Sequence, residues 1–331
     1  MKVLVTGATG FLGNQLTRRL LDEGMEVRVL VRSKTKLAEF EGLDPHHLEV
    51  ALGDATNEAS LVDAARGVNG VFHLAGLIAY SKQQRQAMED VNVQGTKNLI
   101  SAIKKNGSPR LLHLSSVVAI GAGFSPDQIL DESSPYNVAH LGLGYFDTKH
   151  DAEVAVFAAV HRNEIEAVAI NPSTIYGPGD AKKGSRGAQL KVARGKFPFY
   201  PPGGVNVVHV DDVVDLCIKA FRSNKNGERY IACGENLTIH ETFTRIAKLA
   251  GVKPPSIALP RSVIFGLGKI GDLLESVGSK GPINSDNAWT STMFHWFKYE
   301  KAKREFGFQP KPAQEALEAS IKWSRDHGLI G

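Results

Sequence analysis

Two side chains suited to proton transfer stand four residues apart near the middle of the chain. They are the phenol of Tyr145 and the ammonium group of Lys149. Residues with this spacing share one face of a helix. A free tyrosine has a pKa of about 10, too high for ready proton exchange at neutral pH, and a nearby cation lowers it by stabilising the phenolate. The pair therefore favours a tyrosine that works as an acid or base, although the same spacing is also common on solvated helix faces.

A pair of serines offers a second chemical group. Ser115 and Ser116 end an apolar run that is expected to form a strand over residues 111–115. A serine hydroxyl at the carboxyl end of such a strand can donate a hydrogen bond to a substrate carbonyl as negative charge develops on its oxygen. The hydroxyl therefore strengthens the interpretation of the tyrosine and lysine as a chemical pair.

A glycine-rich segment near the start of the chain predicts a binding loop for a dinucleotide. The segment GATGFLG, residues 7–13, lies between an expected strand at 3–6 and an expected helix at 11–23. The glycines permit a tight turn and a close approach of the backbone to a diphosphate, whose charge rests on the helix N-terminus. Because of this placement, a dinucleotide loop is favoured over a glycine-rich turn without a ligand.

The residues after the second expected strand indicate which dinucleotide the loop would hold. This strand covers residues 26–31 and is followed by Arg32, Ser33 and Lys34, with Lys36 close by. An acidic residue at this point would bind the ribose 2′-hydroxyl of NAD and repel a 2′-phosphate, whereas cations offer donors to the phosphate. NADP(H) is therefore favoured over NAD(H), although Lys34 and Lys36 are equally compatible with solvated loop charges.

The elements that must position these groups follow from the pattern of apolar residues. The first half alternates β-branched runs with amphipathic stretches, which is typical of a parallel sheet wrapped by helices. Strands are expected at 3–6, 26–31, 48–52, 70–74, 111–115 and 167–171, and helices at 11–23, 58–66, 88–105 and about 145–162. The predicted fold class is α/β, a doubly wound parallel (Rossmann) sheet with a smaller, mainly helical C-terminal substrate domain.

Beyond residue 172 the alternation breaks down and glycine and proline accumulate. Strands are expected at 205–210 and 229–232, around a helix at 211–221, and a last amphipathic helix at 313–327. We therefore predict a dinucleotide-binding domain of residues 1–171 plus about 205–232. The predicted substrate-binding domain comprises about 172–204 plus 233–331, with the substrate cleft between the two domains.

Composition excludes several other classes of protein. In 331 residues the net charge is only +4 and no basic run occurs, so a nucleic-acid partner is not expected. The two cysteines, Cys217 and Cys233, have neither disulfide-framework nor zinc-site spacing, which favours a cytoplasmic location and no metal site. No apolar run is long enough for a transmembrane helix, and residues 263–274, interrupted by glycines and a lysine, are expected to form a surface or pocket helix.

Taken together, the motifs resemble the extended short-chain dehydrogenase/reductase superfamily over nearly the whole chain. The matching segments are TGATGFLG at 6–13, Gly53-Asp54, HLAG at 73–76, NVQGT at 92–96, Ser115-Ser116, Tyr145 with Lys149, and NPSTIYGPG at 171–179. With Arg32, the sequence is most similar to the dihydroflavonol 4-reductase-like group and its bacterial relatives, some of which are labelled hopanoid-associated sugar epimerases.

The resemblance implies a role for each matching residue. Tyr145 would be the proton donor, Lys149 would bind the nicotinamide ribose and tune the phenol, and Ser116 would polarise the carbonyl, with Ser115 as the less favoured substitute. Asp54 would contact the adenine, and Asn92 would be mainly structural. The implied cofactor-binding residues are Gly7, Thr9, Gly10, Phe11, Leu12, Gly13, Arg32, Lys36, Asp54, Ala55, Leu74, Ala75, Gly76, Asn92, Ser115, Tyr145, Lys149, Pro172, Ser173 and Thr174. The resemblance also implies a homodimer formed through the helices near 88–105 and 145–162.

Three functions fit these residues: a reductase that transfers hydride from NADPH to a ketone or aldehyde, a sugar or nucleotide-sugar epimerase with a retained cofactor, and a nucleotide-binding sensor or scaffold. Nucleotide-sugar epimerases of this superfamily usually carry an arginine where Val205 stands, and sugar-nucleotide dehydratases carry an Asp-Glu pair where Val117-Val118 stands. The sensor requires the tyrosine, lysine and serine to be idle. The reductase is therefore favoured, with a small-molecule carbonyl or alcohol as its substrate.

The substrate pocket is expected to be built from residues 78–84, 121–124, 136–144, Tyr176 and 189–201. These segments hold aromatic residues that suit a flat or apolar substrate but equally fit a core or a lid: Phe124, Tyr136, Phe197, Phe199 and Tyr200.

Overall fold

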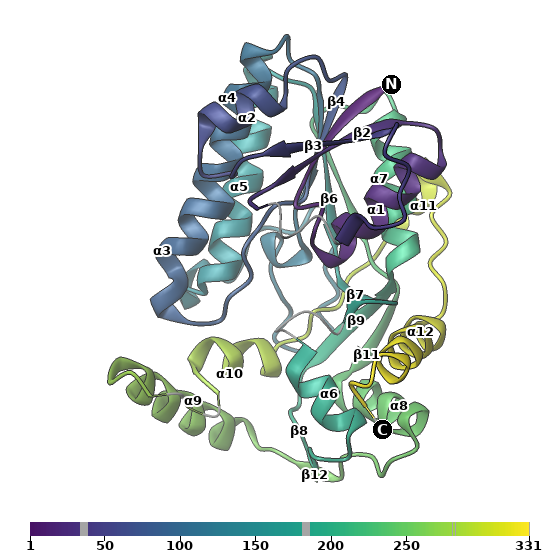
Figure 1. Ribbon diagram of the computed structural model, residues 1–331. Helices are drawn as coiled ribbons and strands as arrows, with labels where there is room; N and C mark the ends of the chain where they lie inside the picture. Colours follow the sequence, from purple (N-terminus) through teal and green to yellow (C-terminus); the bar gives the residue numbers. More distant parts are fainter. Residues whose placement is uncertain (34–38, 181–185, 280, 282, 331) are drawn as a thin grey trace.

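A seven-stranded parallel sheet forms the centre of the computed structural model, which describes residues 1–33, 39–180, 186–279, 281 and 283–330 (Figure 1). The strand order is β10-β6-β5-β4-β1-β2-β3, so the order reverses beside β1. The strands are β1 (Lys2–Thr6), β2 (Glu26–Val31), β3 (Leu48–Leu52), β4 (Gly70–His73), β5 (Arg110–Leu114), β6 (Ala167–Pro172) and β10 (Glu228–Ala232). This arrangement confirms the predicted doubly wound α/β fold, in which ligands bind outside the carboxyl ends of the strands at the reversal.

Helices cover both faces of the sheet (Figure 1). One face carries α2 (Glu58–Ala64), α4 (Gly95–Lys105) and α5 (Gly144–His161), and the other carries α1 (Phe11–Asp22), α7 (Val210–Arg222) and α11 (Glu300–Phe306). Successive side chains of a strand point to opposite faces. Accordingly, Val3 and Val5 of β1 join the core beneath α1 and α7, while Leu4 joins the core beneath α2, α4 and α5.

The helix expected at 88–105 is longer and less regular than the sequence pattern indicates. It begins as α3 (Arg85–Met88), passes through a π-helical segment, η3 (Glu89–Gln94), and continues as α4. A π-helical turn inside an α-helix is often found at a functional site. Here it carries Asn92, whose contacts are described below.

The C-terminal part of the chain adds a second, smaller sheet of order β11-β9-β7. It consists of β7 (Thr174–Tyr176), β9 (Gly204–His209) and β11 (Glu235–Thr238), with α6 (Gly187–Ala193), α8 (Ile239–Ala250) and α12 (Ala313–Asp326) packed around it. The strand expected at 205–210 therefore exists, but it pairs within this small sheet. The following helix α7 and strand β10 pack on the large sheet, and the two predicted domain boundaries stay a prediction.

Two further pairs of elements complete the lower end of the molecule in Figure 1. The short strands β8 (Phe199–Tyr200) and β12 (Ile257–Ala258) pair in parallel, and α9 (Arg261–Ser276) packs against α10 (Ser285–Thr292). None of the helices within the described ranges is both long enough and apolar enough to cross a membrane. Among the described residues, no group of His, Cys, Asp or Glu side chains is arranged to hold a metal ion.

Candidate active site and dinucleotide loop

The glycine loop at the end of β1 can be formed only by glycine at two of its positions. Gly7 has a φ of +71°, and a Cβ there would lie 2.6 Å from the backbone of Leu74 and Ala75. A Cβ on Gly13 would lie 2.1 Å from the carbonyl oxygen of Gly7. The loop is thus held tightly between the start of α1 and the end of β4.

The N-terminus of α1 fits an anion. Its N-cap residue, Gly10, provides no side-chain cap, and the first turn contains no acidic residue. The positive end of the helix dipole is therefore not neutralised by a side chain of the first turn, and its first backbone N–H groups suit the diphosphate of a dinucleotide. Thr9, Phe11 and Leu12 complete the loop and the first helical turn around Gly10.

The residues expected to select the cofactor lie along the same edge of the sheet. Arg32 directly follows β2 and is exposed, and β2 ends beside the end of β3 because Val31 pairs with Leu52. Asp54, two residues beyond β3, accepts hydrogen bonds from the backbone and hydroxyl of Thr56, both at 2.9 Å. Lys34 and Lys36 lie outside the described residues.

Tyr145 lies in the first turn of α5 at the carboxyl end of β5. Its phenol belongs to an apolar cluster and is only 9% exposed. The Ser116 hydroxyl, in the turn after β5, donates a hydrogen bond to the phenol oxygen, which lowers the pKa of Tyr145. Burial has the larger effect and raises that pKa to about 12. The structure thus brings the predicted serine and the predicted phenol into contact.

Lys149 points into the site, away from bulk water. It is 6% exposed, and its Nζ donates a hydrogen bond of 2.7 Å to the carbonyl oxygen of Leu114, the last residue of β5. Burial lowers the pKa of Lys149 to about 8, while the negative charge of Glu153 raises it. The ammonium group is not among the groups that shift the pKa of Tyr145, so the expected lowering by a cation is not seen: burial of the phenol dominates.

Ser115 and Ser116 have different surroundings. Ser115 is 4% exposed, and its hydroxyl has no hydrogen-bond partner anywhere in the described part of the chain. A buried hydroxyl without a partner is costly. Its position at the carboxyl end of β5 therefore fits a contact to a bound cofactor, whereas Ser116 faces the phenol.

Asn92 connects the loop after β4 to the helix that carries the phenol. Its Oδ1 accepts a hydrogen bond from the backbone of Leu77 at 2.7 Å, and its Nδ2 donates to the carbonyl of Leu77 and to the hydroxyl of Thr148. A Cβ on Gly76 would come within 3.3 Å of Asn92 Oδ1. These contacts fit the structural role that the resemblance implies for Asn92.

A buried polar chain supports the glycine loop, and it joins residues of three of the matching motifs whose mutual contacts were not predicted. His73 contacts the hydroxyl of Thr6 at 2.7 Å and that of Thr96 at 3.2 Å, and Thr6 also accepts a hydrogen bond from the amide of Ala75. Burial lowers the pKa of His73 to about 3, so the ring is neutral. The chain links β1, β4 and α4 directly beneath the loop, and Ala55 lies nearby because its carbonyl oxygen accepts from Asn98 of α4.

The segment after β6 leads from the large sheet into the small one. Pro172 ends β6, Ser173 donates a hydrogen bond of 2.6 Å to Asn206 of β9, and Thr174 begins β7. Asn206 is fully buried and also bonds Gly234. The sequence analysis did not single out Asn206. The signal that could have done so is an asparagine inside the apolar run 205–210, because a buried amide needs hydrogen-bond partners.

The aromatic wall around Tyr145 differs from the expected one. Tyr80 lies edge-on to the Tyr145 ring at 6.0 Å, and Phe124 lies edge-on to Trp289 of α10 at 6.5 Å. Met293 completes the same apolar cluster. Phe197 and Tyr200 instead pack with α8 at the core of the small sheet, and their place in a substrate pocket stays a prediction.

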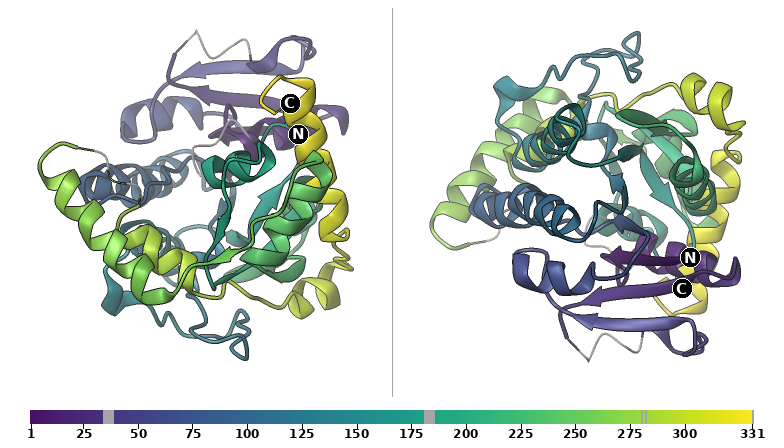
Figure 2. Two further views of the ribbon diagram at one scale, coloured as in Figure 1. Left: turned by 90° about the horizontal axis from the view of Figure 1, so that it is seen from below. Right: turned by 90° about the horizontal axis from the view of Figure 1, so that it is seen from above.

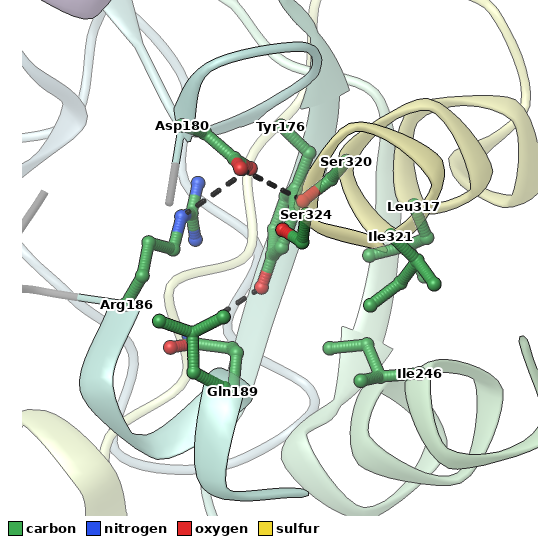
Figure 3. Close-up of a pocket in the computed structure, with 10 residues that line it drawn as sticks. Tyr176, Asp180, Arg186, Gln189, Ile246, Leu317, Ser320, Ile321 and Ser324 are labelled. Atoms are coloured by element: carbon green, nitrogen blue, oxygen red, sulfur yellow. Dashed lines mark hydrogen bonds and ion pairs between the residues drawn. The ribbon is translucent and has the colours of Figure 1, made fainter. Parts of the chain in front are cut away.

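Tyr176 lines a different, small pocket between β7, α6, α8 and α12 (Figure 3). The guanidinium of Arg186 stacks on the Tyr176 ring at 3.8 Å and forms an ion pair of 3.5 Å with Asp180, which also accepts a hydrogen bond from Ser320. The pocket is lined by Tyr176, Asp180, Arg186, Gln189, Leu190, Ile246, Leu317, Ser320, Ile321 and Ser324. Tyr176 thus helps to hold α6 against α12.

Comparison with known proteins agrees with this geometry. The model of the NAD dependent epimerase/dehydratase family matches residues 3–233. Sterol demethylase protein B of Methylococcus capsulatus is 30% identical, with 100% of both chains covered. A putative dihydroflavonol 4-reductase of Synechocystis sp. is 29% identical, with 98% of this chain and 95% of that protein covered.

Solved structures share the fold over the whole length. The crystal structure of gox2253 is 33% identical with a TM-score of 0.86, and 99% of each chain is covered. MoeE5, solved in complex with UDP-glucose and NAD, is 22% identical with a TM-score of 0.76, again with 99% of each chain covered. The first agrees with the relationship in sequence, and the second shows likeness of fold alone.

Proposed function

The chain belongs to the NAD dependent epimerase/dehydratase family, and we propose that it works within that family as an NADP(H)-dependent reductase of a ketone or aldehyde. The observation that carries the proposal is the hydrogen bond between Ser116 and Tyr145 at the carboxyl end of β5, with Lys149 turned inward beside it. This trio stands where the fold places its ligands.

The residues divide the chemistry among them. A bound NADPH supplies the hydride that reduces the carbonyl carbon. When the substrate binds, Ser116 turns its single hydroxyl proton from the phenol oxygen to the carbonyl oxygen and stabilises the charge that develops there. Tyr145 then transfers its phenolic proton to that oxygen, which yields the alcohol. Even with a pKa of about 12, the phenol is a stronger acid than the alcohol being formed, so the transfer is downhill.

Lys149 positions the reacting groups in this proposal. Its hydrogen bond to Leu114 holds the ammonium against the end of β5, where it would also reach a ribose hydroxyl of the cofactor. The lowered pKa, about 8, lets the amine give up and regain a proton near neutral pH. It can therefore pass a proton from water toward the phenolate and restore Tyr145.

The choice of NADP(H) rests on Arg32. An exposed arginine at the end of β2 offers two parallel donors to a 2′-phosphate, while no acidic residue stands there to hold the 2′-hydroxyl of NAD. MoeE5 binds NAD, but its likeness to this chain lies in the fold alone. Fluorescence titration of NADPH and NADH should show that NADPH binds more tightly. Arg32→Ala should reduce this difference in affinity, whereas the control Arg66→Ala, at an exposed arginine away from the loop, should leave it unchanged. Equal affinities for NADPH and NADH, in both the wild type and Arg32→Ala, would reject the proposed cofactor.

Following NADPH absorbance with a panel of carbonyl compounds tests the reaction. Net oxidation of NADPH, lost in Tyr145→Phe although that variant still binds NADPH, supports the reductase. Two observations together would instead indicate a sugar or nucleotide-sugar epimerase. Mass spectrometry of the purified protein would show a tightly retained cofactor, and the absorbance assay would show no net oxidation of NADPH. Undiminished turnover in Tyr145→Phe would remove the phenol from the mechanism, and nucleotide binding without any turnover would indicate a sensor.

We also propose the assembly and location that accompany this function. The outer face of α4 and α5 exposes Val154 at 50% and is hollowed beside Ile100 and Ala155, which suits a homodimer formed through these helices. Cys217 and Cys233 are both buried and free, which suits a reducing cytoplasm. Sedimentation of the purified protein tests the dimer.

A further inference from the structure

One face of α9 is apolar and exposed. Val263, Ile270, Leu273 and Val277, along α9 and just beyond its end, are 45%, 54%, 68% and 70% exposed. Ile270, Leu273 and Val277 follow Val263 by seven, ten and fourteen residues, which places all four on one side of the helix. The exposed Gly266 lies on the same side. Contiguous exposed apolar side chains of this kind mark a contact surface. We refer to these five residues as the α9 stripe.

The opposite face of α9 is fixed firmly to the protein. A Cβ on Gly271 would lie 1.7 Å from the carbonyl oxygen of Ile283, and one on Gly268 would lie 3.1 Å from Ala288 of α10. The backbones therefore meet closely along this side. The stripe cannot turn inward without breaking this contact.

The acidic residues of α9 also face inward. Asp272 accepts hydrogen bonds from the backbone of Ser285 and from Lys82, and Glu275 accepts from Ser81 and Asn284. They are the only acidic residues of the segment 253–277, which the structure describes throughout, and neither is exposed. The outward side of α9 is consequently left with apolar, small and cationic side chains.

The neighbouring strands β8 and β12 extend this surface. Their Phe199 and Ile257 are 37% and 48% exposed, and the two strands are paired directly ahead of α9. They lie with α9 along the lower edge of the molecule in Figure 1, and in front in the view from below in Figure 2. The exposed cations of the same segments are Lys196, Lys253, Arg261 and Lys269, and within the described part of the chain no ion pair engages any of them. We call the α9 stripe, Phe199, Ile257 and these four cations the basal surface.

We propose that the basal surface seats the protein on an anionic lipid bilayer, with the α9 stripe lying at the boundary between headgroups and acyl chains. An apolar helix face with a lysine beside it, here Lys269, is the arrangement that binds such an interface, and the exposed cations at the start of α9 and in the neighbouring segments add to its positive charge. The cations would meet the negative surface potential, and the inward-turned carboxylates avoid repulsion from it. A second copy of the chain fits less well, because residues 253–277 offer no exposed carboxylate that could pair with these cations across a twofold contact.

Vesicle flotation of the full-length protein tests the proposal. We expect flotation with vesicles of phosphatidylcholine containing one-third phosphatidylglycerol, and much weaker flotation with pure phosphatidylcholine or at high salt. The double variant Leu273→Glu/Val277→Glu should bind at least about tenfold more weakly, because burial of one leucine-sized side chain changes an equilibrium by about 10- to 100-fold. Arg261→Gln/Lys269→Gln should bind about fivefold more weakly per removed cation.

Leu52→Glu is the matched control, since Leu52 is 52% exposed on the edge strand β3 of the large sheet. It should float like the wild type, and thermal unfolding checks that every variant is folded. Wild-type protein that stays with the lipid-free fraction, or α9 variants that float normally, would overturn the proposal. So would an oligomer seen by sedimentation that Leu273→Glu/Val277→Glu dissociates, because a second copy would then cover the stripe. The readout is independent of the proposed reductase activity, so either proposal can fail alone.

Discussion

Replacing Lys149 by methionine should separate the stability of this protein from its activity. Burial lowers the pKa of Lys149 from 10.5 to about 8. That difference corresponds to about 3 kcal/mol by which the charged ammonium destabilises the folded state. Methionine keeps the length of the side chain and removes the charge, but it leaves the Leu114 carbonyl without its hydrogen bond. At pH 7 we therefore expect Lys149→Met to be as stable as the wild type or up to about 2 kcal/mol more stable, and inactive.

The pH dependence gives the decisive measurement. Below pH 8 the lysine is protonated in both the folded and the unfolded state, so the wild type carries the full cost of the buried charge. Between pH 8 and 10.5 the folded protein releases the proton first, and the cost disappears. Urea unfolding at several pH values should show this gain. Across that range the free energy of unfolding of the wild type should rise by about 3 kcal/mol relative to that of Lys149→Met.

Other titrating groups cancel in this difference, because both proteins contain them. The exposed Lys97→Met provides the control, for which the difference should stay flat with pH. A Lys149→Met variant that is clearly less stable than the wild type at pH 7, with a difference that does not change up to pH 10.5, would refute the reasoning. The ammonium would then be well solvated, and its place in the proposed mechanism would fail with it.

Three further substitutions test the rest of the site. Gly13→Ala places a Cβ 2.1 Å from a loop carbonyl, so NADPH titration should show binding lost and a thermal scan should show a lower Tm. Ser116→Ala should lower kcat about 100-fold. In alcohol oxidation the phenolate is the base, so kcat/KM rises with pH, and this rise should move to higher pH because the phenol loses the hydrogen bond that lowers its pKa; an unchanged kcat/KM–pH profile would contradict this. Glu153→Gln should lower the free energy of unfolding in urea by about 1 to 3 kcal/mol, because the buried Glu153 loses its charge-assisted contact of 3.0 Å with the partly buried Arg229, and unaltered unfolding would show the pair to be dispensable.

Much of the fold could be predicted because the parallel strands are buried on both faces. Such strands read as apolar runs, and β1, β2 and β6 lie where those runs predict them, within a residue; the half-exposed edge strand β3 also lies where it is predicted. The pattern does not say which strand pairs with which. β9 has the same apolar texture as the central strands, yet its neighbours are the short β7 and β11, which carry too few residues to show a period.

The site shows a similar division between what the sequence reveals and what it does not. The spacing of Tyr145 and Lys149 predicts that they share a helix face, and the position of Ser115 and Ser116 at the end of an expected strand predicts a hydroxyl for a substrate carbonyl. The contact between Ser116 and the phenol was not predicted. The spacing cannot show that burial outweighs the cation in setting the pKa of the phenol, since that depends on packing by distant residues. Trp289 and Met293 reach the site from more than a hundred residues away, and no local pattern connects them to it.

The hydrogen bonds between residues 80–83 and the α9–α10 pair also bear on how the protein is made. Tyr80, Ser81, Lys82 and Gln83 bind partners that lie near the C-terminus, at 272–284. During translation Tyr145 leaves the ribosome long before Trp289, which packs against the same apolar cluster, so this cluster stays open on one side until α10 emerges. The apolar cluster around the phenol therefore cannot close until the segment that contains α9 and α10 has been made.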